Sequence, residues 1–531
     1  MVDWAQLSPT QPRELSAGRL GSPLRRAVRV AAAVALAAAA LAACTSHPDR
    51  RTPPSSAPAS APLSSAPPPS SAAPEAAVTH APPDATSVIA EKSAAMTSVR
   101  MSQLLFASAP TAVLTSSDAT SLTQAASSAQ RLGVPVLISD GAAAGAAVAD
   151  EVRRLGCARV LVVGAAAQVD GVPVVSDDSQ LTVRPPKPLE NAAVLVPTGD
   201  DPGVVAASAT ARAAAAAVIA VHGDDPRADP AVIEALSESR PKHVVAVGAG
   251  FGSARTLASR VATASTGAQL PGGGQRIFPG HRFVALYGHP GTASLGVLGA
   301  QDLDDSIDRA RQLAARYDPL SDVPVIPTFE IIATVAQGAA GKDGDYSGES
   351  SVDSLRPWVE TATAAGLYVV LDLQPGRADP LAQAKMYAPL LALPNVGLAV
   401  DPEWALGPNQ LPLKQIGSID SSKLNAVGGW LDAFTASKHL PQKLFVLHQF
   451  RLSMIGNEAK LRTGYDNLAL LIHMDGQGTQ PNKEATWRSV VAAAPKGVPF
   501  GWKNFTKEDH PMLDPTQTMA RNPKPMMISY Q

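Results

Sequence analysis

Two carboxylic acids separated by a proline stand at the end of an apolar run, in Asp401-Pro402-Glu403. If these residues continue a β-strand, the two side chains share a face about 6.6 Å apart, because alternate residues point the same way. Repulsion between such carboxylates raises the pKa of one of them, which creates a general acid at neutral pH. Glycoside hydrolysis requires such an acid. We therefore predict Glu403 as the general acid and Asp401 as the group that tunes its pKa or orients the substrate.

Further polar residues close other apolar runs of the same region. Glu330 and Asp372 could act as base or nucleophile, and Trp404 and Trp502 could stack on sugar rings. The other predicted substrate-binding residues are Tyr287, His289, Gln374, His448, His473, Asp475, Lys503 and Asn504.

Two other functions fit the same residues. Imidazoles and carboxylates such as His448, His473 and Asp475 can bind zinc, as in a metal-dependent hydrolase or deacetylase. The sequence has no H-x-H or H-E-x-x-H cluster, so we predict a glycosidase that needs neither metal nor cofactor. A non-catalytic protein that binds glycan through the same polar groups is the third possibility, because a fold does not fix a function.

The candidate catalytic and substrate-binding residues lie at the ends of eight short apolar runs. These runs are separated by helix-like segments and by loops that contain Gly and Pro. Such runs are typical of a parallel sheet covered on both faces. Eight of them predict a (β/α)8 barrel over 281–531, whose active site lies at the C-terminal ends of the strands. The runs are 282–289, 323–330, 367–374, 396–404, 443–449, 468–475, 498–504 and 525–531.

A weak internal repeat precedes the barrel, between about 86 and 270. Ala112-Val113-Leu114 recurs as Ala193-Val194-Leu195, the run 136–138 recurs as 218–220, and the run 160–164 recurs as 244–248. Each unit alternates strands with Ala-rich helices, which predicts Rossmann-like parallel sheets. We expect two units, over about 86–185 and 186–270.

The first unit has a specific resemblance. AQRLGVPVLISDG and EVRRLGCARVLVVGAAAQV resemble the type 2 cell-wall-binding repeat of Gram-positive surface proteins, which implies attachment to anionic wall polymers. The second unit is diverged from that repeat. Residues 281–531 are similar to an uncharacterised C-terminal domain that accompanies such repeats in actinobacterial lipoproteins.

The Asp-x-Glu of Asp401 and Glu403 also resembles lysozyme-type and chitinase-type barrel hydrolases. The resemblance covers a few residues only. The longer chitinase pattern would place carboxylates at Val396 and Ala399, and both residues are apolar. The chitinase family is therefore not supported.

The N-terminus has the pattern of an export signal. Several arginines precede an apolar stretch that ends in Leu41-Ala42-Ala43-Cys44, which resembles the lipobox of bacterial lipoproteins. This resemblance implies a cleaved signal peptide over 1–43 and a diacylated Cys44. Residues 44–85 are rich in Pro, Ser and Ala and are expected to form a disordered linker.

The expected location is thus the outer face of the cell membrane, with the lipid as anchor and the folded part facing the wall. The expected partner is a cell-wall polymer or another extracellular glycan. The formal net charge of −2 gives no reason to expect nucleic acid.

Overall fold

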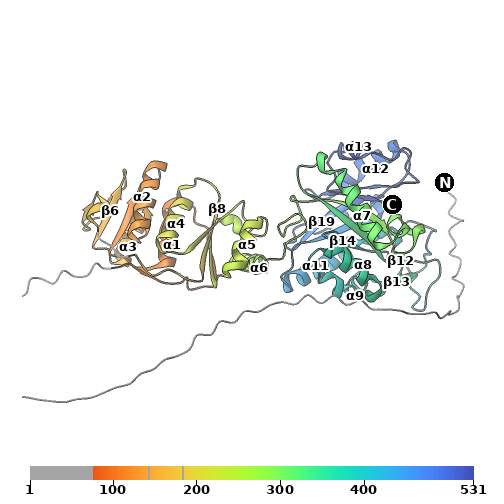
Figure 1. Ribbon diagram of the computed structural model, residues 1–531, viewed down its shortest axis with the longest axis horizontal. Helices are drawn as coiled ribbons and strands as arrows, with labels where there is room; N and C mark the ends of the chain where they lie inside the picture. The colour runs from red at the N-terminus through yellow and green to blue at the C-terminus, as the bar shows by residue number, and fades with distance from the viewer. Residues whose placement is uncertain (1–75, 141–143, 182–184) are drawn as a thin grey trace, which may run out of the picture. The chain divides into compact units, whose positions relative to one another are not determined.

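The computed structural model describes residues 76–140, 144–181 and 185–531 (Figure 1). The predicted signal peptide, the predicted lipidation site Cys44 and the linker up to residue 75 lie outside the described residues. The end of the expected linker contains strand β1 (Val78–Thr79), which pairs antiparallel with β3 (Phe106–Ser108). None of the described helices combines the length and the apolar character needed to cross a bilayer.

The first of two small sheets lies between residues 111 and 175 and is parallel throughout. Its helix α2 (Ala119–Leu132) begins at Asp118, whose carboxylate accepts a hydrogen bond from the Ser121 amide, and ends at Gly133 with a φ of 69°. Only glycine adopts this left-handed conformation without strain, which explains the helix end. A second helix, α3 (Ala144–Leu155), follows β5 in the chain. The strand order is β5 (Val136–Ile138), β4 (Thr111–Thr115), β6 (Arg159–Val163) and β7 (Val174–Val175).

The second small sheet is also parallel and carries the second copy of the repeated runs. Its order is β2 (Thr86–Ile89), β10 (His243–Val247), β8 (Ala192–Pro197) and β9 (Ala217–Val221). The strands that match by sequence, β5-β4-β6 and β9-β8-β10, stand in the same order. Strand β2 comes from the expected first unit but pairs in the second sheet, so the two sheets do not follow the expected boundary near residue 185. Helices of this region are α1 (Ala94–Leu105), α4 (Pro202–Ala213), α5 (Pro230–Ser239) and α6 (Ala254–Ala264).

Residues 282–530 form a closed barrel of eight parallel strands, which confirms the prediction from the eight apolar runs. The barrel closes because the first strand pairs with both the second and the last. In order, the strands are β11 (Arg282–Gly288), β12 (Val325–Ala336), β14 (Tyr368–Leu373), β15 (Val396–Val400), β17 (Lys443–His448), β19 (Leu468–Met474), β20 (Phe500–Asn504) and β21 (Met527–Tyr530).

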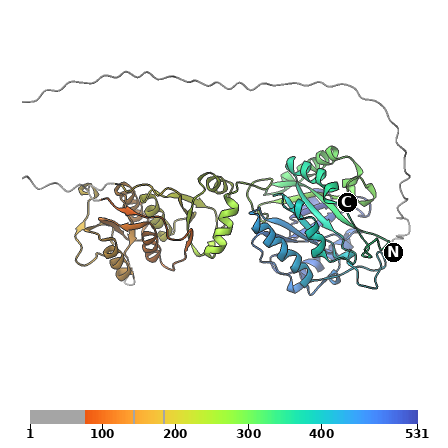
Figure 2. The ribbon, with the colours of Figure 1, turned by 90° about the horizontal axis from the view of Figure 1, so that it is seen from below.

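Helices follow most of the strands and lie around them (Figure 2). They are α7 (Leu303–Ala315), α8 (Val352–Ala364), α9 (Pro380–Met386), α10 (Ala388–Leu391), α11 (Ser421–Ser437), α12 (Gln480–Ala493) and α13 (Pro515–Met519). The connection from β17 to β19 departs from this pattern. It holds short 3-10 turns and β18 (Ile455–Gly456), which pairs with β16 (Ile419–Asp420). Strand β12 also carries an antiparallel neighbour, β13 (Ser347–Glu349).

Of the three apolar clusters of the barrel, the two largest lie outside and inside the ring of strands, because alternate strand residues point in opposite directions. The larger core fills the space between strands and helices. The smaller core lies inside the barrel, and its residues include Phe283, Tyr368, Val446 and Leu471. Leu270 and Ile277, which precede the first strand, belong to this inner core. The apolar filling ends before the C-terminal ends of the strands, where the inward side chains become polar.

Candidate functional site

Eight inward-pointing polar side chains, one from each barrel strand or its end, form the C-terminal layer of the barrel interior. Each is at most 3 % exposed. Their neighbours on the same strands, such as Leu286, Leu371 and Ile472, pack in the outer core, which establishes that the eight point inward. We call this set the polar layer: Tyr287, Glu330, Asp372, Asp401, His448, His473, Lys503 and Ser529.

His448 occupies the centre of the hydrogen-bond network in this layer. Its Nδ1 lies 3.0 Å from Asp475 Oδ2, and its Nε2 lies 2.9 Å from Glu330 Oε1 and 3.8 Å from Asp372 Oδ1. Burial by itself would lower the pKa of His448, but the charges of Glu330 and Asp372 and the hydrogen bonds raise it well above 6.5. His448 is therefore an imidazolium held between carboxylates.

Asp475 is the ionised partner of this imidazolium. Burial opposes its ionisation, but the hydrogen bond and the charge of His448 lower the pKa of Asp475 below its ordinary value. Asp475 Oδ1 has no hydrogen-bond partner among the described residues, and the same holds for Glu330 Oε2 and Asp372 Oδ1. Because buried acceptors normally have partners, these three oxygens are exceptions within the network around His448.

Asp372 connects the carboxylates to the aromatic side of the layer. The Tyr287 hydroxyl donates to Asp372 Oδ2 at 2.9 Å, and Lys503 Nζ lies 3.4 Å from the centre of the Tyr287 ring. Burial raises the pKa of Asp372 to about 6, against the opposing charge of His448. At pH 7 this carboxyl group is mostly ionised.

His473 is the neutral histidine of the layer. Burial and the positive charges of His448 and Lys503 lower its pKa well below 6.5. Its Nε2 lies 2.8 Å from Ser529 Oγ on the last strand. A Cβ atom on Gly501 would lie 2.0 Å from His473 Nδ1, so the ring position requires glycine on the adjacent strand.

Asp401 and Glu403 do not extend the strand, and the expected spacing along one strand face is therefore wrong. Strand β15 ends at Val400, and a 3-10 turn spans Pro402–Trp404. Asp401 caps this turn, because its Oδ1 accepts a hydrogen bond from the Glu403 amide at 3.1 Å. Pro402, the first residue of the turn, has the φ that a 3-10 turn needs. It also lacks the N–H group that a strand would donate to its neighbour.

The pKa of Glu403 is raised, as the proposed role of a general acid requires, but the charge that raises it is not that of Asp401. Burial and the negative charge of Asp475 raise its pKa from 4.5 to about 7. Burial also raises the pKa of Asp401 well above 3.8, although the charge of His448 opposes this. Unlike the polar layer, Glu403 is partly exposed. Asp475, rather than Asp401, is thus the charge that tunes the candidate acid.

Two of the predicted substrate-binding residues face away from the barrel interior, which corrects their prediction. Trp502 is fully buried in the outer core beside Trp487, with ring centres 5.5 Å apart, and cannot stack on a sugar. The Asn504 side chain accepts from Trp502 Nε1 and contacts Thr518 on α13. Both residues alternate with Lys503, which is the inward residue of β20.

The remaining predicted residues lie near the layer. Gln374 Nε2 donates to the Tyr287 hydroxyl at 3.3 Å, while its Oε1 accepts from the Ala336 amide. His289 is held by the Pro290 carbonyl and the Ser350 hydroxyl, with no hydrogen bond to the layer among the described residues. Trp404 is half-buried and follows Glu403 in the 3-10 turn, beside the candidate acid.

Two roles were missed from the sequence. Ser529 completes the polar layer. Its inward direction could have been predicted, because it lies two residues after Met527, which points inward on the last strand. Asp475 was predicted as a substrate-binding residue or a zinc ligand, but not as the partner of His448 that shifts the pKa of Glu403. The latter role depends on proximity between different strands, which the sequence does not contain.

A metal ion in the barrel would have to be bound by the carboxylates and imidazoles of the polar layer. Both ring nitrogens of His448 already contact carboxylates, so the imidazolium occupies the place that a cation would take. In the described parts of the chain, acidic and imidazole groups close enough to share one ion occur at Asp343, Asp345 and Glu349, in and beside β13. The ligand set expected for a zinc hydrolase does not fit the geometry of the polar layer.

The fold and the layer define a (β/α)8-type barrel with a buried, charged layer at the C-terminal ends of its strands. In that fold class this end of the barrel carries the active site. No family model matches the chain, and no curated protein matches it.

Proposed function

We propose that this protein is a glycoside hydrolase that acts on cell-wall or extracellular glycan. The observation that carries the proposal is Glu403, a partly exposed carboxyl group whose pKa of about 7 keeps it half protonated at neutral pH. A group with this pKa can donate a proton and afterwards accept one, as glycosidic bond cleavage requires.

In the proposed reaction the Glu403 carboxyl protonates the glycosidic oxygen as the bond to the anomeric carbon breaks. Asp372, ionised at pH 7 and with an unpartnered Oδ1, is our candidate for the base that activates water or for the nucleophile. Glu330, with an unpartnered Oε2, is the alternative for the same role. His448 and Lys503 offset the negative charge of these carboxylates. Trp404, which follows Glu403 in the turn, is the residue available to stack on a sugar ring.

The test is a screen of the purified protein against peptidoglycan, other wall polysaccharides and small aryl glycosides. Release of reducing ends supports the proposal. Binding without cleavage favours the non-catalytic glycan-binding alternative. Stoichiometric zinc in the active protein, with loss of activity on chelation, favours a metal-dependent hydrolase or deacetylase.

We also propose that the chain is an exported lipoprotein whose N-terminal region attaches to the wall. The lipobox-like sequence before Cys44 supports the anchor. The equal order of the matching strands in the two small sheets supports an interpretation as Rossmann-like repeats, related to cell-wall-binding repeats. The barrel would then act between the membrane and the wall polymers.

Replacing the proposed lipidated residue tests the location. The change Cys44→Ala should move the protein from the membrane fraction to the medium, because a diacyl group supplies the membrane affinity. Immunoblots of cell fractions measure the distribution, and Cys157→Ala is the matched control, expected to leave the protein in the membrane fraction. Membrane retention of the Cys44 variant would contradict the lipoprotein proposal.

A further inference from the structure

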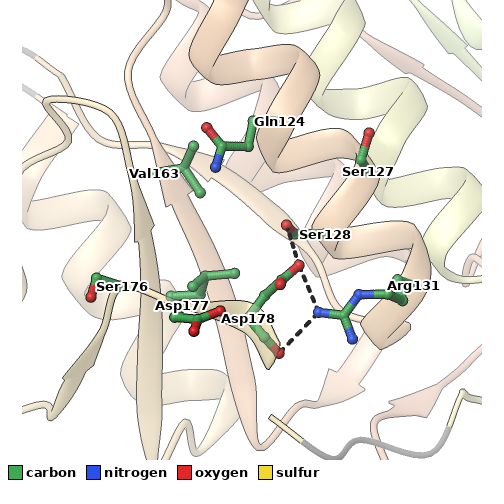
Figure 3. Close-up of a pocket in the computed structure, with 9 residues that line it drawn as sticks. Gln124, Ser127, Ser128, Arg131, Val163, Ser176, Asp177 and Asp178 are labelled. Carbon is green, nitrogen blue, oxygen red and sulfur yellow. Dashed lines mark hydrogen bonds and ion pairs between the residues drawn. The ribbon is translucent and has the colours of Figure 1, made fainter. Parts of the chain in front are cut away.

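A pocket of about 390 Å³ opens on the first small sheet, remote in sequence from the barrel (Figure 3). One wall is the face of α2 that carries Gln124, Ser127, Ser128 and Arg131. Leu161 and Val163 of β6, both almost fully buried, also line the pocket, and residues 176–178 after β7 supply the opposite wall. This volume lies in the lower part of the range of small-ligand sites.

The polar wall is held in place by contacts of its own. Ser128 Oγ donates to Asp178 Oδ2 at 2.7 Å, and Arg131 Nη2 donates to the Asp178 carbonyl at 2.9 Å and pairs with its carboxylate at 2.6 Å (Figure 3). The hydrogen bonds from Arg131 and Ser128 lower the pKa of Asp178, so it stays ionised. Ordered acceptors need no rearrangement to receive hydroxyl donors, which reduces the cost of binding.

Other polar groups of the pocket are free to contact a ligand. The side chains of Gln124 and Ser176 line it and have no hydrogen-bond partner among the residues that the structure describes. An amide and a hydroxyl both donate and accept, as sugar hydroxyls do. The pocket therefore combines fixed acceptors with an uncommitted amide and hydroxyl, above the nearly covered side chains of Leu161 and Val163.

The charges of the lining decide between anionic and neutral ligands. Asp177 and Asp178 contribute two carboxylates, and Arg131, already paired with Asp178, contributes the only cation of the lining residues. The hydrogen bonds from Ser179 lower the pKa of Asp177, so it is ionised as well. A net charge of −1 repels anionic wall polymers, the ligands implied by the family resemblance.

We propose that this pocket binds a neutral saccharide of one or two units. It is a second glycan site, independent of cleavage in the barrel, and its ligand differs in charge from the anionic polymers attributed to cell-wall-binding repeats. Such a site would hold the protein on a polysaccharide while the barrel acts on it or on a neighbouring chain.

Isothermal titration calorimetry of the full chain tests the inference, with maltose, cellobiose and N,N′-diacetylchitobiose as neutral probes and glycerol 3-phosphate as the anionic probe. We expect at least one disaccharide to bind and glycerol 3-phosphate not to bind. Ser127→Trp, which fills the pocket from the exposed face of α2, should weaken that binding at least tenfold, equivalent to about 1.4 kcal/mol. Gln124→Ala should weaken it several-fold.

Gln130 supplies matched controls, because it is an exposed glutamine on the same helix but does not line the pocket. Gln130→Trp and Gln130→Ala should bind like the unchanged protein. If Ser127→Trp does not fold, Gln124→Ala still decides the question. The inference fails if no neutral probe binds, if glycerol 3-phosphate binds more tightly, or if the pocket variants bind like their controls. Saccharide binding in the barrel would persist in Ser127→Trp, which separates this outcome from the proposed function.

Discussion

Glu403→Gln is expected to reduce glycan cleavage by about 10²–10⁴-fold, the usual contribution of a general acid. Glutamine keeps the size of the side chain and its place in the 3-10 turn but has no proton to give to the leaving oxygen. The turn depends on the hydrogen bond that the Glu403 backbone amide donates to Asp401 Oδ1. Glu403→Gln does not alter this backbone donor. Fold and stability should therefore change little. Initial rates on the substrate found by the screen measure the effect.

The pH profile of cleavage separates loss of the acid from general damage. Since burial and Asp475 raise the pKa of Glu403 to about 7, the acid is protonated below pH 7 and loses its proton above it. Cleavage by the unchanged protein should therefore fall as the pH rises through about 7. Residual activity of Glu403→Gln should lack that limb. Glu508→Gln, at an exposed loop position, is the control and should match the unchanged protein. Full activity of the Glu403 variant would refute its role as the acid.

The barrel was predictable because each strand is buried on both faces. A continuous apolar run ending in a polar residue, as in Val370-Leu371-Asp372 or Ile472-His473, reports both the strand and its C-terminal end. The closed parallel barrel then follows from the number of runs. Because alternation continues to the strand end, seven of the eight residues of the polar layer were among the sequence candidates.

Local turn chemistry and contacts between strands were harder to predict. Asp401 and Glu403 were expected on a strand face, but Pro402 and the capping contact of Asp401 make a 3-10 turn there. For Trp502, an aromatic residue near a strand end indicated stacking on sugar. Lys503 points into the barrel, so its neighbour Trp502 must point the other way, into the outer core. This position prevents the predicted stacking. The pairing of β2 with β10 joins segments more than 150 residues apart, and no local pattern predicts it.

The charges in and beside the polar layer explain why the candidate catalytic groups differ in protonation. Asp475 is ionised because it is paired with His448, whereas Asp372 and Glu403, with weaker compensation, keep raised pKa values. One carboxylate is thus fixed as a charge and the others can exchange protons near neutral pH. His448 is the residue on which this difference depends, which makes it the most informative position for a stability experiment.

His448→Leu should destabilise the barrel by about 3–5 kcal/mol at pH 7, because removing one partner leaves buried charges uncompensated. Glu330 and Asp475 would lose the imidazolium 2.9 and 3.0 Å away, and both carboxylates are buried. Urea unfolding followed by tryptophan fluorescence measures the barrel specifically. Five of the six tryptophans lie in it, at 358, 404, 430, 487 and 502, and the sixth is Trp4.

Two comparisons show whether the loss comes from unpaired charge. His222→Leu removes a histidine that also lies 2.8 Å from a carboxylate, Asp229, but is 79 % exposed, and it should change stability by less than about 0.5 kcal/mol. Because His222 follows β9, outside the barrel, the unfolding of this variant is followed by far-ultraviolet circular dichroism. Adding Glu330→Gln and Asp475→Asn to His448→Leu removes the charges of the two carboxylates that are hydrogen-bonded to the imidazole. Because replacing a whole buried ion network costs much less than breaking it, this triple variant should regain at least half of the lost stability. A triple variant no more stable than His448→Leu would mean that the histidine contributes through packing rather than through charge.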